Sequence, residues 1–368
     1  MIESGKKITF LLPTLGGGGA ERMMKNLALT YLQLGYNIEI VLCKKEGVYI
    51  AEIDSRIKII ELGTYHVLPT ALRFRKYLAE SKPDYIISAQ EYTNAAAVLA
   101  NILNCRQSKV LASVRCQITD GLKGLSILNR FYVKSLIRLF YPRADVLVAI
   151  SEGVALDVSK ISGLPLSSIK VIYNPAFDES IIELSQSIEY THEWLESKMS
   201  KVIIGVGRLM DQKDFITLLK AFRQLLSQNY DYKLLILGEG KEKANLEDFI
   251  GRNNLSGSIK ILSFAKNPFP YIRKADVLVL ASKYEGFGNV LVEAMACGTQ
   301  VVSTDCPSGP AEILNKGEFG FLTPIGNEKE MSKAIIKAIT EPIERSVLLK
   351  RAKEFDVNYI AKLYLDAF

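Results

Sequence analysis

Short apolar segments alternate with helical patterns along the whole chain, and this alternation restricts the possible folds more than any other feature. Continuous apolar runs bounded by turn residues are typical of strands buried on both faces, as in parallel sheets covered by helices. The first half contains seven predicted strands, at residues 8–12, 38–42, 57–61, 85–88, 109–113, 146–150 and 169–172. The second half contains six, at residues 202–206, 233–237, 259–262, 277–280, 300–303 and 320–322. We therefore predict an α/β protein with two parallel sheets.

Length and composition favour two globular domains. The chain has 368 residues, 48% hydrophobic and 23% charged, which is a globular composition in a chain too long for one average core. Asn174 and Pro175 open a polar, irregular stretch that runs to about Met199 and is the predicted linker. The segment Ala144–Ser151 is nearly repeated as Ala275–Ser282, which favours a shared architecture in the two halves.

Residues 283–298 form the most informative motif. The segment follows a predicted strand and opens a predicted helix at about Asn289. Two glycines at this junction let a ligand approach the backbone, and the free N–H groups of a helix N-terminus favour an anion. Glu285 precedes the helix, and Glu293 lies about one turn inside it. Amide donors beside two carboxylates suit a ligand that is part phosphate and part polyol, such as a nucleotide-sugar.

Two further motifs also follow predicted strands. The run Gly16–Gly19 separates the first strand from a helix, and it lacks the Gly-Lys-Ser/Thr ending of a P-loop, which disfavours ATP hydrolysis. Gly207 and Arg208 follow the strand at 202–206, and Lys213 stands five positions after the arginine. A guanidinium can bind two phosphate oxygens at once and an ammonium adds a point charge, so this pair suits a diphosphate.

Together, these three motifs resemble those of the family 4 glycosyltransferases. Glu285 and Glu293, with seven residues between them, resemble the family's paired glutamates, and all three motifs occur in the family's order. The resemblance implies the GT-B fold, in which two facing Rossmann-like domains enclose a cleft. An acceptor-side domain would comprise residues 1–175 and a nucleotide-sugar-binding domain 195–354, with a C-terminal helix at about 355–368 crossing back to the first domain.

The resemblance also implies that a sugar is transferred with retention from a nucleotide-sugar, with UDP expected, to a hydroxyl of a glycan or lipid-linked saccharide. Arg208 and Lys213 would bind the diphosphate and stabilise the departing negative charge. Glu293 would bind the ribose, and Glu285 the donor sugar near the reacting carbon. Asn289 could instead be only the N-cap of its helix. The other expected donor-binding residues are Gly207, Phe287, Gly288, Asn289, Gly17, Gly18 and Gly19.

One position departs from the family pattern. Many relatives have a histidine just after the fifth strand, near the donor sugar, whereas this chain has Arg115 and Cys116 there. Arg115 is interpreted either as a ligand of the sugar or acceptor or as a simple surface arginine. Cys116 is interpreted as a small buried residue rather than a nucleophile.

The sequence offers few ligands for a metal. It contains two histidines, no C-x-x-C pair among its five cysteines, and no Asp-x-Asp pair of the kind that Mg²⁺-dependent glycosyltransferases commonly present. We therefore expect no metal and no cofactor, with the nucleotide-sugar as co-substrate. Because no apolar run approaches the ~20 residues of a transmembrane helix and the start leads straight into a strand, we expect a cytoplasmic protein.

The predicted helix at 125–140 has a basic stripe. Arg130, Lys134 and Arg138 recur every four residues, beside Ile127, Phe131 and Ile137. The opposite side is expected to pack on the sheet and contains Leu125, Leu128, Tyr132, Leu136 and Leu139. The stripe suits anionic lipid headgroups or a pyrophosphate-linked acceptor at the cytoplasmic face of the inner membrane, although an ordinary solvated face is also compatible with it.

Two other functions fit parts of this pattern. A UDP-sugar epimerase on the same two-domain plan would need acid and base groups, for which two histidines offer little. A non-catalytic nucleotide- or glycan-binding subunit would not need the intact acidic and basic residues. Nucleic-acid binding is disfavoured, because the net charge of +6 is modest and no such motif occurs. A transferase of bacterial surface polysaccharide or glycan assembly is the expectation.

Overall fold

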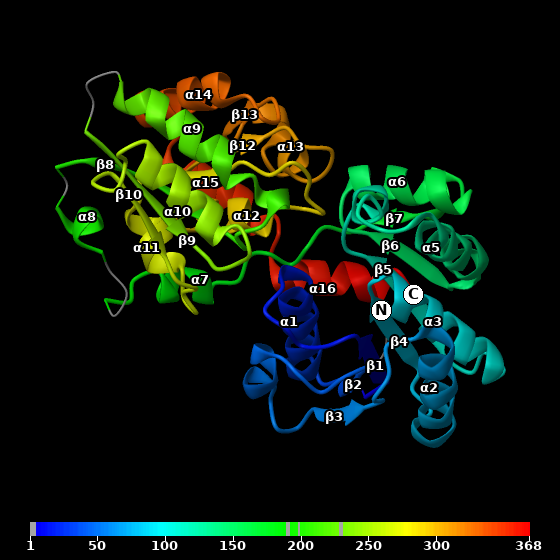
Figure 1. The fold of residues 1–368 in the computed structure, drawn as a ribbon. Helices are drawn as coiled ribbons and strands as arrows, with labels where there is room; N and C mark the ends of the chain where they lie inside the picture. The colour runs from blue at the N-terminus through cyan, green and yellow to red at the C-terminus, as the bar shows by residue number, and fades with distance from the viewer. Residues whose placement is uncertain (1–4, 189–191, 198, 228–230) are drawn as a thin grey trace. The chain divides into compact units, whose positions relative to one another are not determined.

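The computed structural model describes residues 5–188, 192–197, 199–227 and 231–368, and the chain divides into two compact units (Figure 1). The first unit runs to Pro175 and also contains Val357–Phe368, and the second comprises Ala176–Asp356. Each unit contains one fully parallel sheet with helices packed on it. The predicted α/β architecture is therefore present in both units.

Seven strands form the sheet of the first unit, in the order β3-β2-β1-β4-β5-β6-β7. The strands are β1 (Lys7–Leu12), β2 (Asn37–Leu42), β3 (Lys58–Glu61), β4 (Tyr85–Ala89), β5 (Lys109–Val114), β6 (Val146–Ala149) and β7 (Lys170–Val171). The helices are α1 (Gly19–Gln33), α2 (Val67–Ser81), α3 (Glu91–Leu103), α4 (Ile118–Gly121), α5 (Ile127–Phe140), α6 (Glu152–Ser162) and α16 (Val357–Asp366).

Helices cover both faces of this sheet. Because side chains alternate along a strand, Phe10 of β1 packs in the core cluster that contains residues of α1 and α16. Its neighbour Leu11 packs in the other cluster, with residues of α2 and α3 such as Phe74. The central strands β1, β4, β5 and β6 bury nearly all of their side chains, which explains why they are continuous apolar runs in the sequence.

Six strands form the sheet of the second unit, in the order β10-β9-β8-β11-β12-β13. The strands are β8 (Lys201–Val206), β9 (Tyr232–Leu237), β10 (Ile259–Leu262), β11 (Val277–Leu280), β12 (Gln300–Thr304) and β13 (Phe321–Thr323). The helices are α7 (Ser180–Leu184), α8 (Glu193–Glu196), α9 (Phe215–Leu226), α10 (Lys243–Arg252), α11 (Phe269–Lys274), α12 (Asn289–Ala296), α13 (Pro310–Ile313), α14 (Glu328–Thr340) and α15 (Arg345–Lys353).

All thirteen predicted strands are present, and the largest difference is at β7, where four predicted residues become the two of Lys170–Val171. The predicted linker at 174–199 needs a larger correction. The first unit ends at Pro175, and the segment that follows belongs to the second unit and contains α7 and α8. Residues 189–191 and 198 of that predicted linker lie outside the described residues. Short helices of four or five residues leave too little periodicity to be recognised in a sequence.

The helix α16 belongs to the first unit although it is the last element of the chain. It packs along α1, and the hydroxyl of Tyr31 in α1 donates a hydrogen bond of 3.0 Å to the carbonyl oxygen of Ala361. Near its end, the ammonium of Lys170 in β7 donates to the carbonyl oxygen of Ala367 at 2.9 Å. These contacts tie α16 to the first unit.

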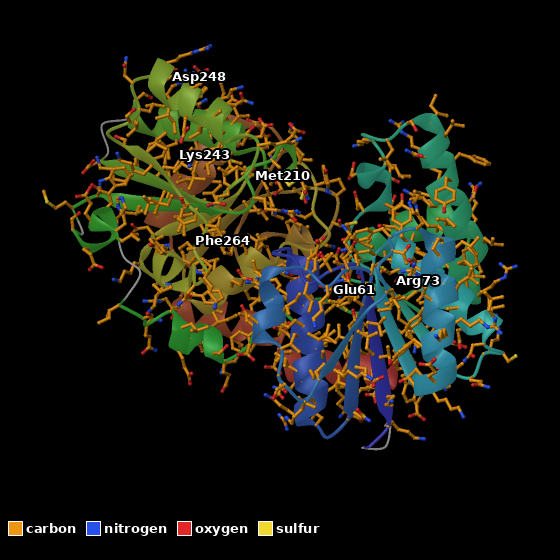
Figure 2. All side chains as sticks on the ribbon, turned by 60° about the horizontal axis from the view of Figure 1, so that its bottom comes forward. Glu61, Arg73, Met210, Lys243, Asp248 and Phe264 are labelled. Carbon is orange, nitrogen blue, oxygen red and sulfur yellow. The ribbon has the colours of Figure 1, made fainter. Side chains whose placement is uncertain are left out.

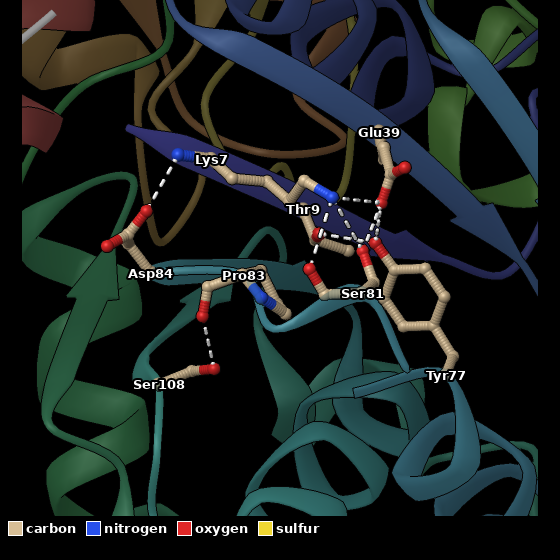
Figure 3. A network of polar contacts seen from close by, with 8 residues as sticks. All are labelled: Lys7, Thr9, Glu39, Tyr77, Ser81, Pro83, Asp84 and Ser108. Carbon is tan, nitrogen blue, oxygen red and sulfur yellow. Dashed lines mark hydrogen bonds and ion pairs between the residues drawn. The ribbon is translucent and has the colours of Figure 1, made fainter. Parts of the chain in front are cut away.

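A polar network at the amino-terminal edge of the first sheet fastens α2 to β1 and β2 (Figure 3). The ammonium of Lys7 lies 3.0 Å from the hydroxyl of Ser81 and 3.6 Å from the carboxylate of Glu39. Ser81 and Tyr77 both donate to Glu39, and Tyr77 also contacts the hydroxyl of Thr9 at 2.7 Å. The network lies at the edge opposite to the loops that follow the strands, so we interpret it as structural.

At three places, an aspartate that precedes one strand accepts a hydrogen bond from a backbone N–H of the neighbouring strand. The carboxylate of Asp84, before β4, accepts a hydrogen bond of 2.9 Å from the backbone N–H of Lys7 in β1. Asp145, before β6, accepts from Val110 in β5 at 2.8 Å, and Asp276, before β11, accepts from Val202 in β8 at 2.8 Å. The near-repeat of 144–151 at 275–282 therefore includes an aspartate with the same role in both units.

Candidate functional site

In the second unit, the candidate residues lie where the strand order reverses. The chain runs from β8 outwards to β10 and then returns to β11 on the other side of β8, so the loops after β8 and β11 leave the same edge of the sheet. Ligands of such sheets bind at this switch point. The N–H of Lys283 donates to the carbonyl oxygen of Gln212 at 2.8 Å, and the side-chain amide of Gln212 donates to Tyr284 at 2.9 Å. Met210, labelled in Figure 2, marks the loop after β8.

Lys213 and Glu285 form an ion pair between these two loops. The lysine ammonium lies 2.5 Å from a carboxylate oxygen of Glu285, which also accepts a hydrogen bond of 2.6 Å from the hydroxyl of Ser282. The carboxylate is buried and the lysine side chain is largely covered. A second pair, between Lys283 and Asp211, joins the same loops at 2.5 Å on the exposed side. The structure therefore brings together two residues that are 72 positions apart.

Arg208 is exposed at the end of β8. Its guanidinium makes no hydrogen bond or ion pair with the residues that the structure describes. The preceding residue, Gly207, lies against the side chain of Lys213, since a Cβ atom at Gly207 would stand 3.4 Å from Cε of the lysine. The arginine is thus a cation without a partner in the described part of the chain, next in sequence to a glycine that contacts the paired Lys213.

The N-terminus of α12 lies beside the buried carboxylate of Glu285. Gly288 is its N-cap with φ +103°, a conformation that favours glycine, and Asn289 is the first helical residue. The alternative in which Asn289 is only the N-cap is therefore wrong, and its expected donor-binding role stays a prediction. Phe287 is buried, and its ring contacts the ring of Phe355 edge-on with centroids 5.5 Å apart. Glu293 is buried in the second turn of α12.

The loop at 308–309 holds the Glu285–Gly288 segment in place. The hydroxyl of Ser308 donates to the backbone carbonyl of Glu285 at 2.5 Å. Gly309 has φ +86°, and a Cβ atom there would lie 1.8 Å from the carbonyl oxygen of Phe287. Glycine is required at 309 because any side chain would displace the segment that precedes α12.

In the first unit, the glycine run forms the loop between β1 and α1. Gly17 is exposed, Gly18 is the N-cap of α1 and Gly19 is its first residue. The carboxylate of Glu21 folds back over Gly18, where a Cβ atom would lie 2.2 Å from Oε2 of the glutamate. The side-chain amide of Gln90, which follows β4, donates to Glu21 at 3.2 Å. Since the strand order reverses between β1 and β4, these residues also mark a switch point.

Arg115 follows β5 and is buried, so the interpretation as a surface arginine is wrong. Its Nη1 donates to the hydroxyl of Tyr364 in α16 at 3.1 Å. Burial lowers the pKa of Arg115, while the neighbouring Tyr364 and Glu21 oppose that shift. Cys116 is exposed rather than buried, with its Sγ 3.5 Å from a carboxylate oxygen of Glu91, so that prediction is also wrong.

The faces predicted for the helix at 125–140 need correction. The buried residues of α5 are Val133, Leu136, Ile137 and Phe140, and the large exposed apolar residues are Ile127, Leu128, Phe131, Tyr132 and Leu139. Leu128, Tyr132 and Leu139, which were predicted to pack on the sheet, are therefore exposed. Arg130, Lys134 and Arg138 are exposed as predicted, but Arg130 donates to the carbonyl oxygen of Leu125 at 2.8 Å and Arg138 to that of Ile161 at 3.0 Å.

The sequence interpretation missed several residues around these loops. Ser282 and Ser308 bind Glu285, and no local pattern distinguishes them from other loop serines. Gln90 is more conspicuous, because it has φ +80°, which a non-glycine residue rarely adopts, and such strain is concentrated at functional sites. Within the described ranges, no group of three or more His, Cys, Asp or Glu side chains is placed to hold a metal ion.

Two family models match the chain, one in each unit. The model described as "Glycosyltransferase Family 4" matches residues 17–177, and the model described as "Glycosyl transferases group 1" matches residues 187–355. The two matches follow the bounds of the two units closely.

Characterised relatives and solved structures match nearly the whole chain. Two relatives from Campylobacter jejuni are N-acetylgalactosaminyltransferases whose names specify saccharides linked to diphospho-undecaprenol or PP-undecaprenol. They are 29% and 26% identical, and the alignments cover 97% and 98% of this chain and 98% and 97% of the relatives. The crystal structure of Anabaena HepE in complex with UDP-glucose is 21% identical, covers 98% of both chains and has a TM-score of 0.79. The predicted fold class, with two Rossmann-like domains, is thereby confirmed.

Proposed function

The chain belongs to the family 4 glycosyltransferases, which have the GT-B fold, and we propose that it transfers a sugar from a UDP-sugar to a hydroxyl of a lipid-linked saccharide. The observation that carries this proposal is the pairing of Lys213 with Glu285 beside the unpartnered Arg208, at the switch point of the second sheet. Two cations, a buried carboxylate and a helix N-terminus all belong to the loops that follow β8 and β11. This combination suits a diphosphate joined to a sugar.

In the proposed reaction, the cations act on the leaving group. As the bond between the anomeric carbon and the diphosphate breaks, negative charge develops on the phosphate oxygens, and fixed positive groups lower the barrier. Arg208 would bind these oxygens with its free guanidinium. Lys213 would approach them from its position beside Glu285, together with the backbone N–H groups at the N-terminus of α12. Gly207 leaves the diphosphate room beside the lysine.

The carboxylates are assigned to the hydroxyl groups of the donor. Glu285, held by Ser282 and Lys213, would accept hydrogen bonds from the sugar, and Glu293 from the ribose. We propose a retaining transfer in which the departing phosphate takes the proton of the attacking acceptor hydroxyl. That step needs no metal and no protein base. The glycine loop at 17–19 of the first unit is assigned to the diphosphate or the acceptor.

The relatives support a finer proposal for both substrates. Two of them are named as transferases of N-acetylgalactosamine to saccharides carried on a polyprenyl diphosphate. We therefore assign an N-acetylhexosamine as the donor sugar and a polyprenyl-diphosphate-linked saccharide as the acceptor. The proposed process is the assembly of a bacterial surface polysaccharide or glycan, at the cytoplasmic face of the inner membrane.

The exposed side of α5 supports peripheral contact with a membrane. Ile127 is 83% exposed, Leu128 81% and Phe131 71%, and they lie on the same helix as Arg130 and Lys134. Apolar side chains next to basic ones suit the headgroup region of an anionic bilayer. No described helix combines the length and apolarity needed to cross the bilayer.

A panel of UDP-sugars with a short-chain polyprenyl-diphosphate-linked saccharide tests the transferase directly. Transfer of one sugar with release of UDP is the expected result, and the anomeric configuration of the product reports retention. The same donors incubated without acceptor, together with a donor-binding measurement, separate the two other functions. Epimerisation of the sugar ring would support an epimerase, and binding of every donor without transfer to any acceptor would support a non-catalytic subunit.

A further inference from the structure

The guanidinium of Arg115 has one bonded edge and one unbonded edge. Its Nη1 donates to the hydroxyl of Tyr364, with the hydroxyl of Ser113 at 3.5 Å. Its Nε and Nη2 are buried and have no hydrogen-bond partner among the described residues. Arg115 as a whole is 7% exposed. Burying a cation with unpaired donors is unfavourable, so the structure points to an acceptor that completes this edge.

The geometry of the unbonded edge restricts that acceptor. Nε–H and one Nη2–H of a guanidinium point in the same direction, and together they bind two oxygens of a carboxylate or phosphate side by side. A single hydroxyl or carbonyl oxygen would have to accept from both donors at once and would leave the buried positive charge uncompensated. An oxyanion satisfies both and also neutralises the buried charge.

The neighbours of Arg115 form a polar edge of the first sheet. Arg115 follows β5, Gln90 follows β4, and Glu21 lies in the first turn of α1 after β1, so all three stand at the carboxyl ends of strands. Burial lowers the pKa of Arg115, and the charge of Glu21 is among the groups that oppose this shift, so the carboxylate favours the charged guanidinium. Gln90 holds that carboxylate at 3.2 Å, and Glu21 itself lies over the glycine at the start of α1.

We propose that Arg115 binds a phosphate oxyanion through its Nε–Nη2 edge, next to the N-terminus of α1, and that Glu21 is an internal carboxylate that opposes this binding. The inference rests on the proposed function, because it assigns the phosphate to one of the two reactants of the transferase. The phosphate belongs either to the diphosphate of the UDP-sugar or to the diphosphate of the lipid-linked acceptor. Both reactants present the same chemistry to the arginine.

Calorimetric titrations with three probes test the site: inorganic pyrophosphate, UDP and geranyl diphosphate. Arg115→Lys keeps the positive charge but loses the two parallel N–H donors of the guanidinium. In this variant we expect pyrophosphate to bind about tenfold more weakly than in the wild-type protein. In Glu21→Gln, which removes a competing negative charge, we expect severalfold tighter binding. Tyr364→Phe is the matched control, because it removes the hydroxyl bonded to Nη1 and leaves the unbonded edge intact, so pyrophosphate affinity should stay within about twofold.

The remaining two probes identify the source of the phosphate. Weaker binding of geranyl diphosphate to Arg115→Lys, with UDP unchanged, would assign the site to the acceptor, and the reverse would assign it to the donor. Arg115→Met tests whether a loss of binding could come from misfolding. The midpoint of its thermal unfolding without anion should match that of the wild type, and pyrophosphate should no longer raise this midpoint.

Equal pyrophosphate affinity in wild type and Arg115→Lys, or a pyrophosphate-dependent rise that persists in Arg115→Met, would overturn the proposal and leave Arg115 as a tether for α16. A failure of the proposed function looks different. Sugar transfer would then be undetectable with every donor, while pyrophosphate binding would still depend on Arg115.

Discussion

The ammonium of Lys213 lies 2.5 Å from a carboxylate oxygen of Glu285, and these two residues are the ones that the proposed mechanism assigns to opposite sides of the breaking bond. Without ligand, each neutralises the other in a partly buried place. A bound diphosphate would compete with Glu285 for the lysine, and the carboxylate would then be free to accept hydrogen bonds from the sugar. The pair therefore couples recognition of the phosphate to recognition of the sugar.

Replacing Glu285 with Gln should have opposite effects on binding and turnover. Without the carboxylate, Lys213 loses its internal partner and the site loses a negative charge close to the diphosphate, so we expect UDP to bind about three- to tenfold more tightly. Turnover should fall by about 10²-fold, because the sugar loses a charged acceptor. Calorimetry with UDP and a transfer assay measure the two effects. Weaker UDP binding in Glu285→Gln would show that the carboxylate does not oppose the diphosphate.

Removing either cation should impair turnover without unfolding the protein. We expect Arg208→Ala and Lys213→Ala each to lower kcat by about 10²-fold or more, because each variant lacks a positive charge that would stabilise the negative charge developing on the departing phosphate. Lys283→Ala is a matched control: this lysine lies in the same pair of loops and is paired with Asp211, so its loss should change kcat by less than about threefold. Near-wild-type rates in both test variants would refute the diphosphate assignment.

Gly309→Ala should reduce activity by displacing the segment before α12. Its φ of +86° strains any other residue, and a Cβ atom would clash with the carbonyl oxygen of Phe287. Gly317→Ala is the control, since Gly317 has φ +103° and nothing lies within 4 Å of its Cβ position. We expect Gly317→Ala to cost about 1–2 kcal/mol of unfolding free energy with normal turnover. Gly309→Ala should cost more and should lower kcat, as urea titration and a transfer assay would show.

Membrane binding should depend on apolar residues of α5 as well as on its charges. We expect the double variant Ile127→Ser, Phe131→Ser to lose binding to anionic vesicles at both low and high salt, because apolar insertion is not screened by ions. Neutralising Arg130, Lys134 and Arg138 should weaken binding at low salt. Phe264→Ser is the matched control, because Phe264 is 58% exposed in the second unit (Figure 2). Vesicle co-sedimentation that is unchanged in the double variant would remove the membrane assignment.

Acid should destabilise the first unit through Glu39. Burial raises the pKa of this carboxyl, but hydrogen bonds from Ser81 and Tyr77 and the charges of Lys7 and Lys58 outweigh it, so the pKa lies below its ordinary value of 4.5. A lowered folded-state pKa stabilises the fold above the unfolded-state pKa, and this contribution is lost as the pH falls through the folded-state value. In urea titrations, the free energy of unfolding of the wild-type protein should decrease as the pH falls below about 4.5. In Glu39→Gln, the free energy of unfolding should depend less on pH over this range.

The strands could be predicted from the sequence because most of them are apolar runs, some of which, such as β6 and β11, have every residue buried. The faces of α5 could not. Apolar residues surround its first turns, so the sequence does not indicate which arc packs on the protein. The buried set Val133, Leu136, Ile137 and Phe140 has regular helical spacing, but so does the set that we first assigned to the sheet. Contacts with α3 and α6 decide between them, and these contacts are not encoded in the helix itself.

The candidate residues could be found individually, but not their partners. The glycine, arginine, lysine and glutamate motifs occur in a family order, whereas the pairing of Lys213 with Glu285 depends on which strands become neighbours. Arg115 shows the same limit. Its hydrogen-bond partner Tyr364 lies 249 positions away in the last helix, where no local pattern could reveal the contact.

The assignment of α16 to the first unit has a consequence for the order of events during translation. All of the second unit is synthesised before Val357–Phe368 emerges from the ribosome, and at about 5–20 residues per second the delay amounts to many seconds. During that interval Tyr31 and Arg115 lack the partners that α16 supplies, and α1 packs on its face of the sheet without α16. The first half of the chain, although it is made first, can therefore complete its core only after the last helix has been released.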